Sequence, residues 1–375
     1  MSHQVTVDFE GVSTKIQIQC DQAAHALCKI DKVLENVKAN ANKIESSKLR
    51  EYEEYLLQSK EIIQNKIDSF LLKLESYKAL KTQRVDMDLN YARSTSNISI
   101  ASKWKELNGA ITNEALELEK IVLDLTGAKL SVIDQLVNEG LISFIEESQK
   151  KILNEINGVK NYDESLVEQI NKIDNISLRD LAFQQLSKGI TNYDEIINNS
   201  QIEYNRLLQG SSFVENIQID LKNAGIPQTE IDEIIQKPIN ISTVSKIQEE
   251  AHSKIVDESI RKETLKVIIK SIRDRGFIVD TKKNLKIDRE KNIVKLIAKK
   301  PDGKTAEFEI SLNGKFMYHF DGYEGLACNQ DINPFLEDLK NIYDINILHE
   351  EVHWSNPDKI QTQKYQYINT NKNKE

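Results

Sequence analysis

The sequence predicts a mostly α-helical protein with a small α+β domain near its C-terminus. A seven-residue apolar repeat begins at Ala23, helical apolar spacing dominates as far as residue 257, and alternating runs with turn residues appear between Arg275 and Leu339. From these patterns we expect a β-hairpin (1–22), a long helix or coiled coil (23–82), a helical bundle (83–210), a helical connector (211–257), an α+β domain with an antiparallel sheet (258–356) and a disordered tail (357–375).

The N-terminal segment alternates apolar and polar residues on both sides of Glu10-Gly11. Gln4–Phe9 and Thr14–Cys20 therefore read as the two strands of a hairpin. An isolated two-stranded hairpin is marginally stable in water, so it must rest on a helix or on a partner's sheet. This hairpin is a candidate interface.

The heptad repeat has two interpretations. Its apolar positions step alternately by four and three residues, as in helices that wind around each other. One interpretation is a coiled-coil arm for dimerisation or partner binding, with Leu27, Ile30, Leu34 and Val37 as the contact residues. The other is an intramolecular helical bundle that uses the same seam. The repeat continues after a slip near residues 45–48, so a long helix or a closely spaced pair is expected.

The middle of the chain is expected to be helical, with interruptions. Arg84–Ser102 lacks clear periodicity and is rich in Ser, Thr and Asn, which predicts a loop or a helix break. Helical runs then continue to Gly210-Ser211-Ser212, the best candidate for a domain boundary. Short helices with Pro227 and Pro238 between them form the expected connector.

Turn chemistry predicts the C-terminal sheet. Pro301-Asp302-Gly303 and Asn313-Gly314 separate three alternating runs, which predicts an antiparallel meander over Asn292–Lys299, Ala306–Leu312 and Phe316–Phe320. Apolar residues at helical spacing before and after these runs predict two helices that cover one face. Gly276 is the expected C-cap of the first helix, with Asp331 or Asn333 as the N-cap of the second and Pro334 at its first position.

Composition restricts the partners. The formal net charge is −9, which gives no general attraction for nucleic acid or anionic membranes, although the strip Lys282–Lys300 is locally basic. No apolar run reaches the roughly 18 residues of a membrane span, and the N-terminus does not resemble a signal peptide. The three cysteines show no disulfide or zinc spacing. We expect a cytoplasmic protein, and the abundance of Ile, Lys and Asn suggests a prokaryote or its phage.

One local motif matches a zinc-hydrolase pattern. His349-Glu350-Glu351-Val352-His353 is an H-E-x-x-H, which on a helix places His349 and His353 on one face for zinc and Glu350 as general base. The surrounding residues 344–354 alternate, and Ser355-Asn356-Pro357 would end any helix within one turn. A strand that carries two histidines on one face, able to bind metal weakly, is the competing interpretation.

The segment after the last predicted strand contains Gly322, Tyr323, Gly325 and Cys328. Two glycines three residues apart predict a tight β-to-α connection, and these residues are candidate interaction positions. This G-aromatic-x-G-x-x-C turn, followed by an amphipathic helix, resembles about 40 residues of a small uncharacterised bacterial domain family often encoded beside AAA+ ATPases. The resemblance implies an ATPase as a partner and no established chemistry.

Together these observations predict a non-enzymatic scaffold or adaptor without a cofactor. It would be a subunit of a prokaryotic multi-protein system, ATPase-associated or involved in antiviral defence, acting through coiled-coil and sheet-edge contacts with a protein partner or as a homo-oligomer. The alternative is a zinc-dependent hydrolase that uses His349, Glu350 and His353.

Overall fold

The computed structural model describes residues 3–41, 46–89, 95–125, 127–158, 163–288, 291–312, 315–324, 327–341 and 345–355. The chain forms two compact units, each built from separate stretches of sequence. The sheet unit comprises Met1–Ile18, Leu74–Thr112 and Val256–Glu375, and the helical unit comprises Gln19–Lys73 and Asn113–Ile255. The predicted boundary between residues 210 and 211 therefore does not separate the two units.

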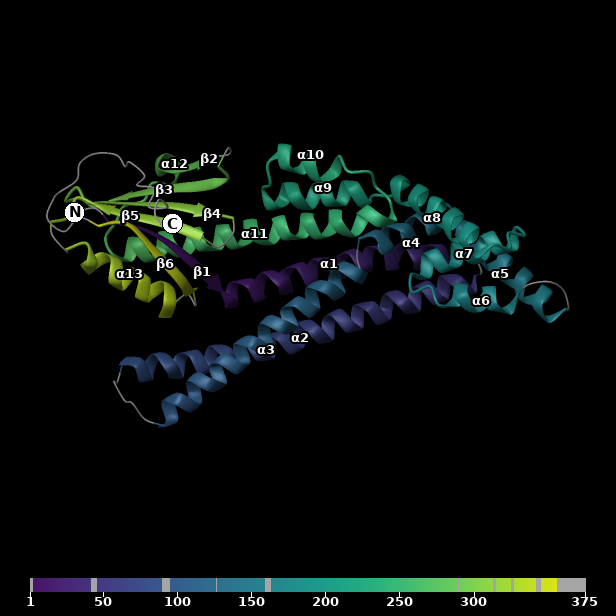
Figure 1. The fold of residues 1–375 in the computed structure, drawn as a ribbon, viewed down its shortest axis with the longest axis horizontal. Coiled ribbons are helices and arrows are strands. Elements are labelled where there is room, and N and C mark those ends of the chain that lie inside the picture. Colours follow the sequence, from purple (N-terminus) through teal and green to yellow (C-terminus); the bar gives the residue numbers. More distant parts are fainter. Residues whose placement is uncertain are drawn as a thin grey trace, which may run out of the picture. The chain divides into compact units, whose positions relative to one another are not determined.

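The fold is mostly α with a C-terminal antiparallel sheet, as the sequence predicts (Figure 1). The helices are α1 (Val12–Ala41), α2 (Ser47–Leu89), α3 (Thr95–Leu125), α4 (Ala128–Asn138), α5 (Leu141–Asn157), α6 (Glu164–Asn171), α7 (Ile176–Ser187), α8 (Tyr193–Gly210), α9 (Phe213–Ala224), α10 (Gln228–Ile235), α11 (Ile241–Asp274), α12 (Thr281–Asn284) and α13 (Asn329–Asn341). The strands are β1 (His3–Gly11), β2 (Leu285–Asp288), β3 (Ile293–Lys299), β4 (Thr305–Ser311), β5 (Lys315–Asp321) and β6 (Ile345–Ser355).

The sheet has six strands in the order β2-β3-β4-β5-β1-β6, and every pairing is antiparallel. The predicted meander forms β3, β4 and β5, close to the expected bounds. At the turn after β3, Gly303 has φ 88° and donates its N–H to Lys300 O at 3.1 Å. Asn313-Gly314 lies outside the described residues. Local turn chemistry thus specified the centre of the sheet.

One face of the sheet packs against α11 and α13. Ile268 and Ile272 from α11 and Phe335 and Leu339 from α13 lie in one core cluster with the inward residues of β3, β4 and β5. Gly276 ends α11 as predicted: its φ is 78°, and Phe277 N–H donates to Ile272 O at 3.1 Å in a Schellman arrangement.

Two local predictions in this unit are wrong. The second strand of the N-terminal hairpin does not exist, because α1 begins at Val12 and runs through the predicted strand 14–20. The strand β1 instead lies between β5 and β6 and obtains its hydrogen bonds from both. In addition, α13 begins at Asn329 and contains Pro334 in its interior. The strands that give β1 its hydrogen bonds are distant in the sequence, so the residues next to β1 do not reveal them.

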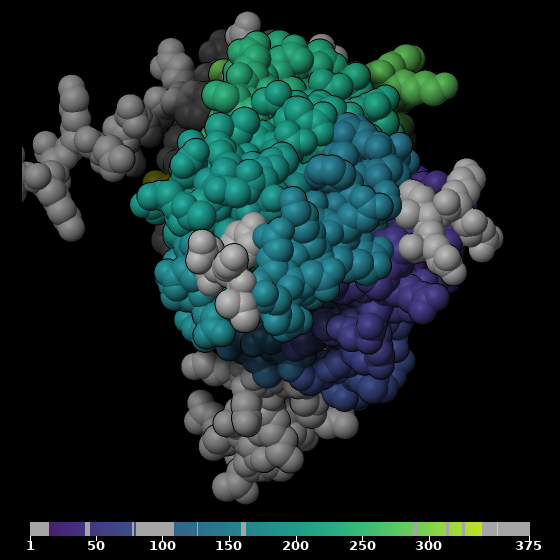
Figure 2. All heavy atoms as spheres, turned by 90° about the vertical axis from the view of Figure 1, so that its right-hand side faces the viewer, coloured from purple at the N-terminus to yellow at the C-terminus, as the bar shows by residue number. Residues whose placement is uncertain are grey.

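The helical unit is held by buried apolar contacts and by a central carboxylate. Its α5–α8 segment packs around Ile152, Ile170, Leu186 and Ile196. In Figure 2 the blue and teal atoms of this segment form one continuous surface.

Asp180 on α7 is fully buried and ties three helices of this unit together. It accepts hydrogen bonds from Tyr52 Oη at 2.7 Å and Gln149 Nε2 at 2.8 Å, and Lys48 Nζ lies 3.1 Å away. Each of these contacts gives a buried oxygen of Asp180 a polar partner. Together they link α2, α5 and α7.

A second carboxylate, that of Glu146, caps the N-terminus of α2. Glu146 on α5 accepts from the backbone N–H of Ser47 at 3.0 Å and from its hydroxyl at 2.7 Å. A negative group at a helix N-terminus is favourable because it meets free N–H groups and the positive end of the helix dipole.

Candidate functional site

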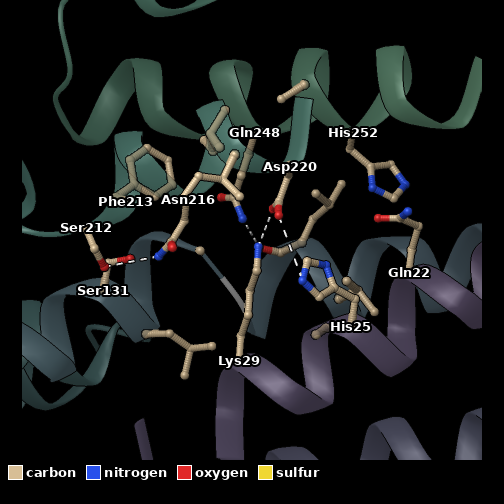
Figure 3. A pocket seen from close by; sticks show the side chains of 18 of the residues that line it. Gln22, His25, Lys29, Ser131, Ser212, Phe213, Asn216, Asp220, Gln248 and His252 are labelled. Atoms are coloured by element: carbon tan, nitrogen blue, oxygen red, sulfur yellow. Dashed lines mark hydrogen bonds and ion pairs between the residues drawn. The ribbon is translucent and has the colours of Figure 1, made fainter. Parts of the chain in front are cut away.

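A cleft in the helical unit is the main candidate site. It has a volume of about 490 Å³, which is the size of a small-molecule pocket, and its walls come from α1, the end of α3, α4, α9 and α11. Figure 3 shows Ser131 and Ser212 towards one end, Gln22 and His252 towards the other, and Lys29 and Asp220 between them.

Two helices present polar stripes to this cleft. On α1, His25, Lys29 and Lys32 recur at i, i+4 and i+7, and on α9, Asn216, Asp220 and Asn223 do the same. Residues with this spacing share one face of a helix. The stripe of α9 is anchored at its start by Phe213, whose ring is 1% exposed.

An ion pair joins the two stripes. Lys29 Nζ lies 2.5 Å from Asp220 Oδ2, and His25 Nε2 lies 3.8 Å from Asp220 Oδ1. The two paired side chains are only 29% and 18% exposed, so they are partly shielded from water. We call this contact the Lys29–Asp220 bridge.

Burial is the main influence on the pKa of His25, the histidine beside the bridge. Burial lowers the pKa of His25, the positive charge of Lys29 lowers it further, and Asp220 offsets part of this effect. His25 is therefore uncharged at neutral pH and can donate one hydrogen bond and accept another.

Gly127 allows the side chain of Gln248 to line the cleft. A Cβ at Gly127 would lie 2.0 Å from Gln248 Nε2, and the φ of this residue is +77°. The positive φ requires glycine at this position, and any larger residue would also displace the amide of Gln248. Gln248 also donates to Leu123 O at 3.4 Å, which holds its amide against the wall of the cleft.

At one end of the cleft, His252 meets a carboxylate. His252 is 8% exposed, and its Nε2 lies 3.1 Å from Glu119 Oε1. Gln19 Nε2 donates to the other oxygen of Glu119 at 3.3 Å. These contacts connect α1, α3 and α11 within the helical unit.

The predicted coiled-coil residues lie inside the chain. Ile30, Leu34 and Val37 are 0%, 6% and 1% exposed, and Leu27 is partly buried. The structure thus uses this seam in an intramolecular bundle, which is one of the two interpretations of the heptad repeat. These side chains are not available to a second chain while the unit is folded.

The predicted turn residues form a closed ionic cluster in the sheet unit. Tyr323 is 2% exposed and its hydroxyl donates to Asp331 Oδ2 at 2.6 Å, while Lys300 Nζ donates to both oxygens of Asp331 at 2.8 and 2.7 Å. Gly322 has φ +85° and lies against Gly303 and Lys304. Tyr323 and Gly322 therefore have structural contacts, and Gly325 lies outside the described residues.

The H-E-x-x-H motif lies on a strand. His349 and Glu350 pair with Asp8 and Val7 of β1, and His353 falls at a register shift between Val352 and Trp354. The zinc geometry of the hydrolase alternative requires a helix, and the motif lies in strand β6 instead. Among the side chains that the structure describes, no group of three His, Cys, Asp or Glu is arranged to hold a metal ion.

The basic strip is partly neutralised by the chain itself. Lys295 Nζ lies 2.7 Å from Glu309 Oε1 across β3 and β4, and Lys300 is bound to Asp331. This pairing weakens the positive potential that a nucleic acid would meet.

Sequence reasoning missed the cleft. The pattern His25-Lys29-Lys32 is visible in the sequence, but a polar stripe opposite an apolar seam is the normal outer face of a helix. This face of α1 becomes a wall of the cleft only because α9 and α11 pack opposite it in the folded chain. The lining residues lie up to 233 positions apart, from Gln22 to Ile255.

Comparison with models of protein families, with curated proteins and with solved structures gives no match to this chain. Within the described residues, no helix is both long and apolar enough to cross a lipid bilayer.

Proposed function

We propose that the chain is a non-enzymatic adaptor subunit of a prokaryotic, cytoplasmic multi-protein system, of the ATPase-associated or antiviral-defence type. The observation that carries the proposal is the position of β6, an 11-residue strand at the end of the six-stranded sheet. A long terminal strand is a template for the addition of a partner's strand. The opposite edge is β2, which has four residues and offers a much shorter ladder.

The occupant is an extended segment of a different protein. If two copies of β6 paired antiparallel over their full length, Ile345 would lie opposite Ser355 and Glu350 opposite its own copy. Like charges placed directly opposite each other destabilise a strand pair. A foreign strand with a basic or neutral residue at that position avoids this repulsion.

The test combines partner capture with variants of the strand edge. Consecutive residues of a strand direct their N–H groups to opposite edges. Of the two variants His349→Pro and Glu350→Pro, one therefore removes a hydrogen-bond donor to β1, and the other removes a donor on the outer edge of β6. The variant that retains the stability of the sheet unit is the outer-edge variant. We expect it to lose binding to the captured partner, measured with purified proteins.

The control is Lys286→Pro in β2, which should leave binding unchanged. An outer-edge variant that binds its partner as tightly as the natural chain does, or recovery of the chain alone as a monomer, would exclude the proposal.

A further inference from the structure

We propose that the cleft of the helical unit binds a free amino acid with an apolar side chain. The ligand's carboxylate would replace Asp220 at Lys29, and its ammonium group would replace Lys29 at Asp220. This assigns a small-molecule site to the chain and does not depend on the adaptor function.

The charges of the lining match a ligand with no net charge. The charged residues that line the cleft are two lysines, Lys29 and Lys32, and two aspartates, Asp134 and Asp220. Asp134 also accepts a hydrogen bond from Asn36 at 2.6 Å. The two lysines and the two aspartates balance, so these four residues contribute no net charge to the lining. A strongly anionic ligand would find no surplus positive charge.

The bridge explains why the ligand should carry both charges. Lys29 and Asp220 face each other across the cleft and are partly shielded from water. An anion that took Lys29 would leave Asp220 without its partner, and a cation that took Asp220 would leave Lys29 without its partner. Leaving one member of a shielded ion pair unpaired is destabilising. A zwitterion replaces both partners at once.

The remaining lining suits a small apolar body. The lining also includes apolar residues, among them the buried Ala26, Val33, Val122, Leu130 and Phe213, which we call the apolar floor. Asn216 and Gln248 add amide groups on the walls, and Asn216 Nδ2 donates to Ser212 Oγ at 3.1 Å. Pockets for small molecules combine such an apolar surface with a few fixed polar groups.

The experiment uses the full chain and matched probes. L-leucine, L-methionine and L-phenylalanine are each added, and Tm and Kd are measured by thermal shift and calorimetry. Two analogues of leucine separate the charges: 4-methylpentanoate lacks the ammonium group and 3-methylbutylamine lacks the carboxylate. Inorganic phosphate and adenosine monophosphate test the cleft as an anion site.

We expect at least one amino acid to raise Tm by about 5 °C or more at a hundred times its Kd. Each single-charge analogue should bind about tenfold or more weakly, because it leaves one partner of the bridge unpaired. The proposal is overturned if none of the amino acids binds, or if phosphate or adenosine monophosphate binds more tightly than any of them.

Variants separate a ligand role from a structural one. Asp220→Asn and Lys29→Gln should each weaken amino-acid binding by about tenfold or more. The double variant with Lys29→Asp and Asp220→Lys keeps an ion pair and so keeps the fold, but it reverses the two charges relative to the apolar floor. It should still bind poorly, whereas a purely structural bridge would be rescued.

The matched control is Asp31→Asn. Asp31 pairs with Lys60 at 2.6 Å between α1 and α2 and does not line the cleft, so this variant should bind as the natural chain does. Binding that survives both Asp220→Asn and the charge exchange would also overturn the proposal.

Discussion

Each unit contains an aspartate–lysine pair, and the two pairs differ in their surroundings. In the sheet unit, Asp331 meets Lys300 and Tyr323, and the side chains of Asp331 and Lys300 are 14% and 17% exposed. In the helical unit, Asp220 meets Lys29 at the wall of a cleft of about 490 Å³. The same chemistry thus forms a closed structural contact in one unit and a contact open to a ligand in the other.

The difference follows from how each unit fills its interior. In the sheet unit, Phe335 lies with its ring centroid 5.4 Å from that of Phe308 and 6.3 Å from that of Phe320, within one continuous core. In the helical unit, the ring of Phe213 is buried but borders the cleft. In a closely packed region a polar pair can contact only protein groups. Beside a cavity, a ligand or water can replace one of these groups.

The largest expected effect is the loss of a core ring. Phe335→Ala should lower the free energy of unfolding of the sheet unit by about 3 to 5 kcal/mol, because it leaves a cavity among aromatic neighbours. Phe213→Ala should cost the helical unit less, about 2 to 3 kcal/mol, because Phe213 is buried but borders the cleft, so water can enter part of the space that its ring vacates.

Urea unfolding can follow the two units separately. Trp104 and Trp354 both belong to the sheet unit, so tryptophan fluorescence reports that unit, while far-UV circular dichroism reports all helices. Equal losses for the two alanine variants would contradict the contrast in packing.

The next effect compares the two aspartates. Asp331→Asn should lower the stability of the sheet unit by about 2 to 4 kcal/mol, because it removes the charge that Lys300 and Tyr323 share. Asp220→Asn should cost about 1 kcal/mol, because water in the cleft can solvate the released Lys29. The same two-probe urea titration measures both values, and a larger loss for Asp220→Asn would reverse the comparison.

Two carboxylates, one in each unit, should respond to acid with opposite signs. Burial raises the pKa of Glu146 in the helical unit, but hydrogen bonds from Ser46, Lys150 and Ser47 outweigh burial and bring the pKa to about 2, from 4.5. Its contribution is present above pH 4.5 and is lost as pH falls towards 2. In the sheet unit, burial raises the pKa of Asp321, against a hydrogen bond from Gly322 N–H, so protonation of this group favours the folded state.

Stability against pH should therefore change with two variants. Glu146→Gln should remove about 2 kcal/mol at neutral pH, after allowance for solvent screening, and should flatten the acid dependence of the helical unit. Asp321→Asn should stabilise the sheet unit slightly at neutral pH and change little in acid. Circular dichroism and tryptophan fluorescence during acid titration follow the two responses, and an unchanged acid profile in Glu146→Gln would contradict this account.

The smallest expected effect is the loss of an exposed ion pair, and it serves as the reference for the other stability changes. Asp31→Asn breaks an ion pair whose side chains are 43% and 41% exposed, so the change in stability should stay below about 0.5 kcal/mol. Thermal unfolding measures it. A loss as large as that of Asp331→Asn would mean that exposure does not separate structural pairs from surface pairs in this chain.

The sequence by itself determined the elements whose signals are local. Gly303 and Gly276 marked a turn and a helix end because their positions require positive φ, and the alternation of β3, β4 and β5 showed which residues face the core. The apolar seam of Ile30, Leu34 and Val37 likewise followed from helical spacing alone. The helices that pack against this seam did not.

Only the tertiary structure decided what each of these elements meets. It placed β1 between β5 and β6, gave the seam an internal partner, put His349 and His353 on a strand, and brought Asp220 to Lys29. The physical reason is the same in each case. Periodicity reports which face of an element is apolar, whereas contacts between residues 100 or more positions apart depend on the packing of the whole unit, which no local pattern records.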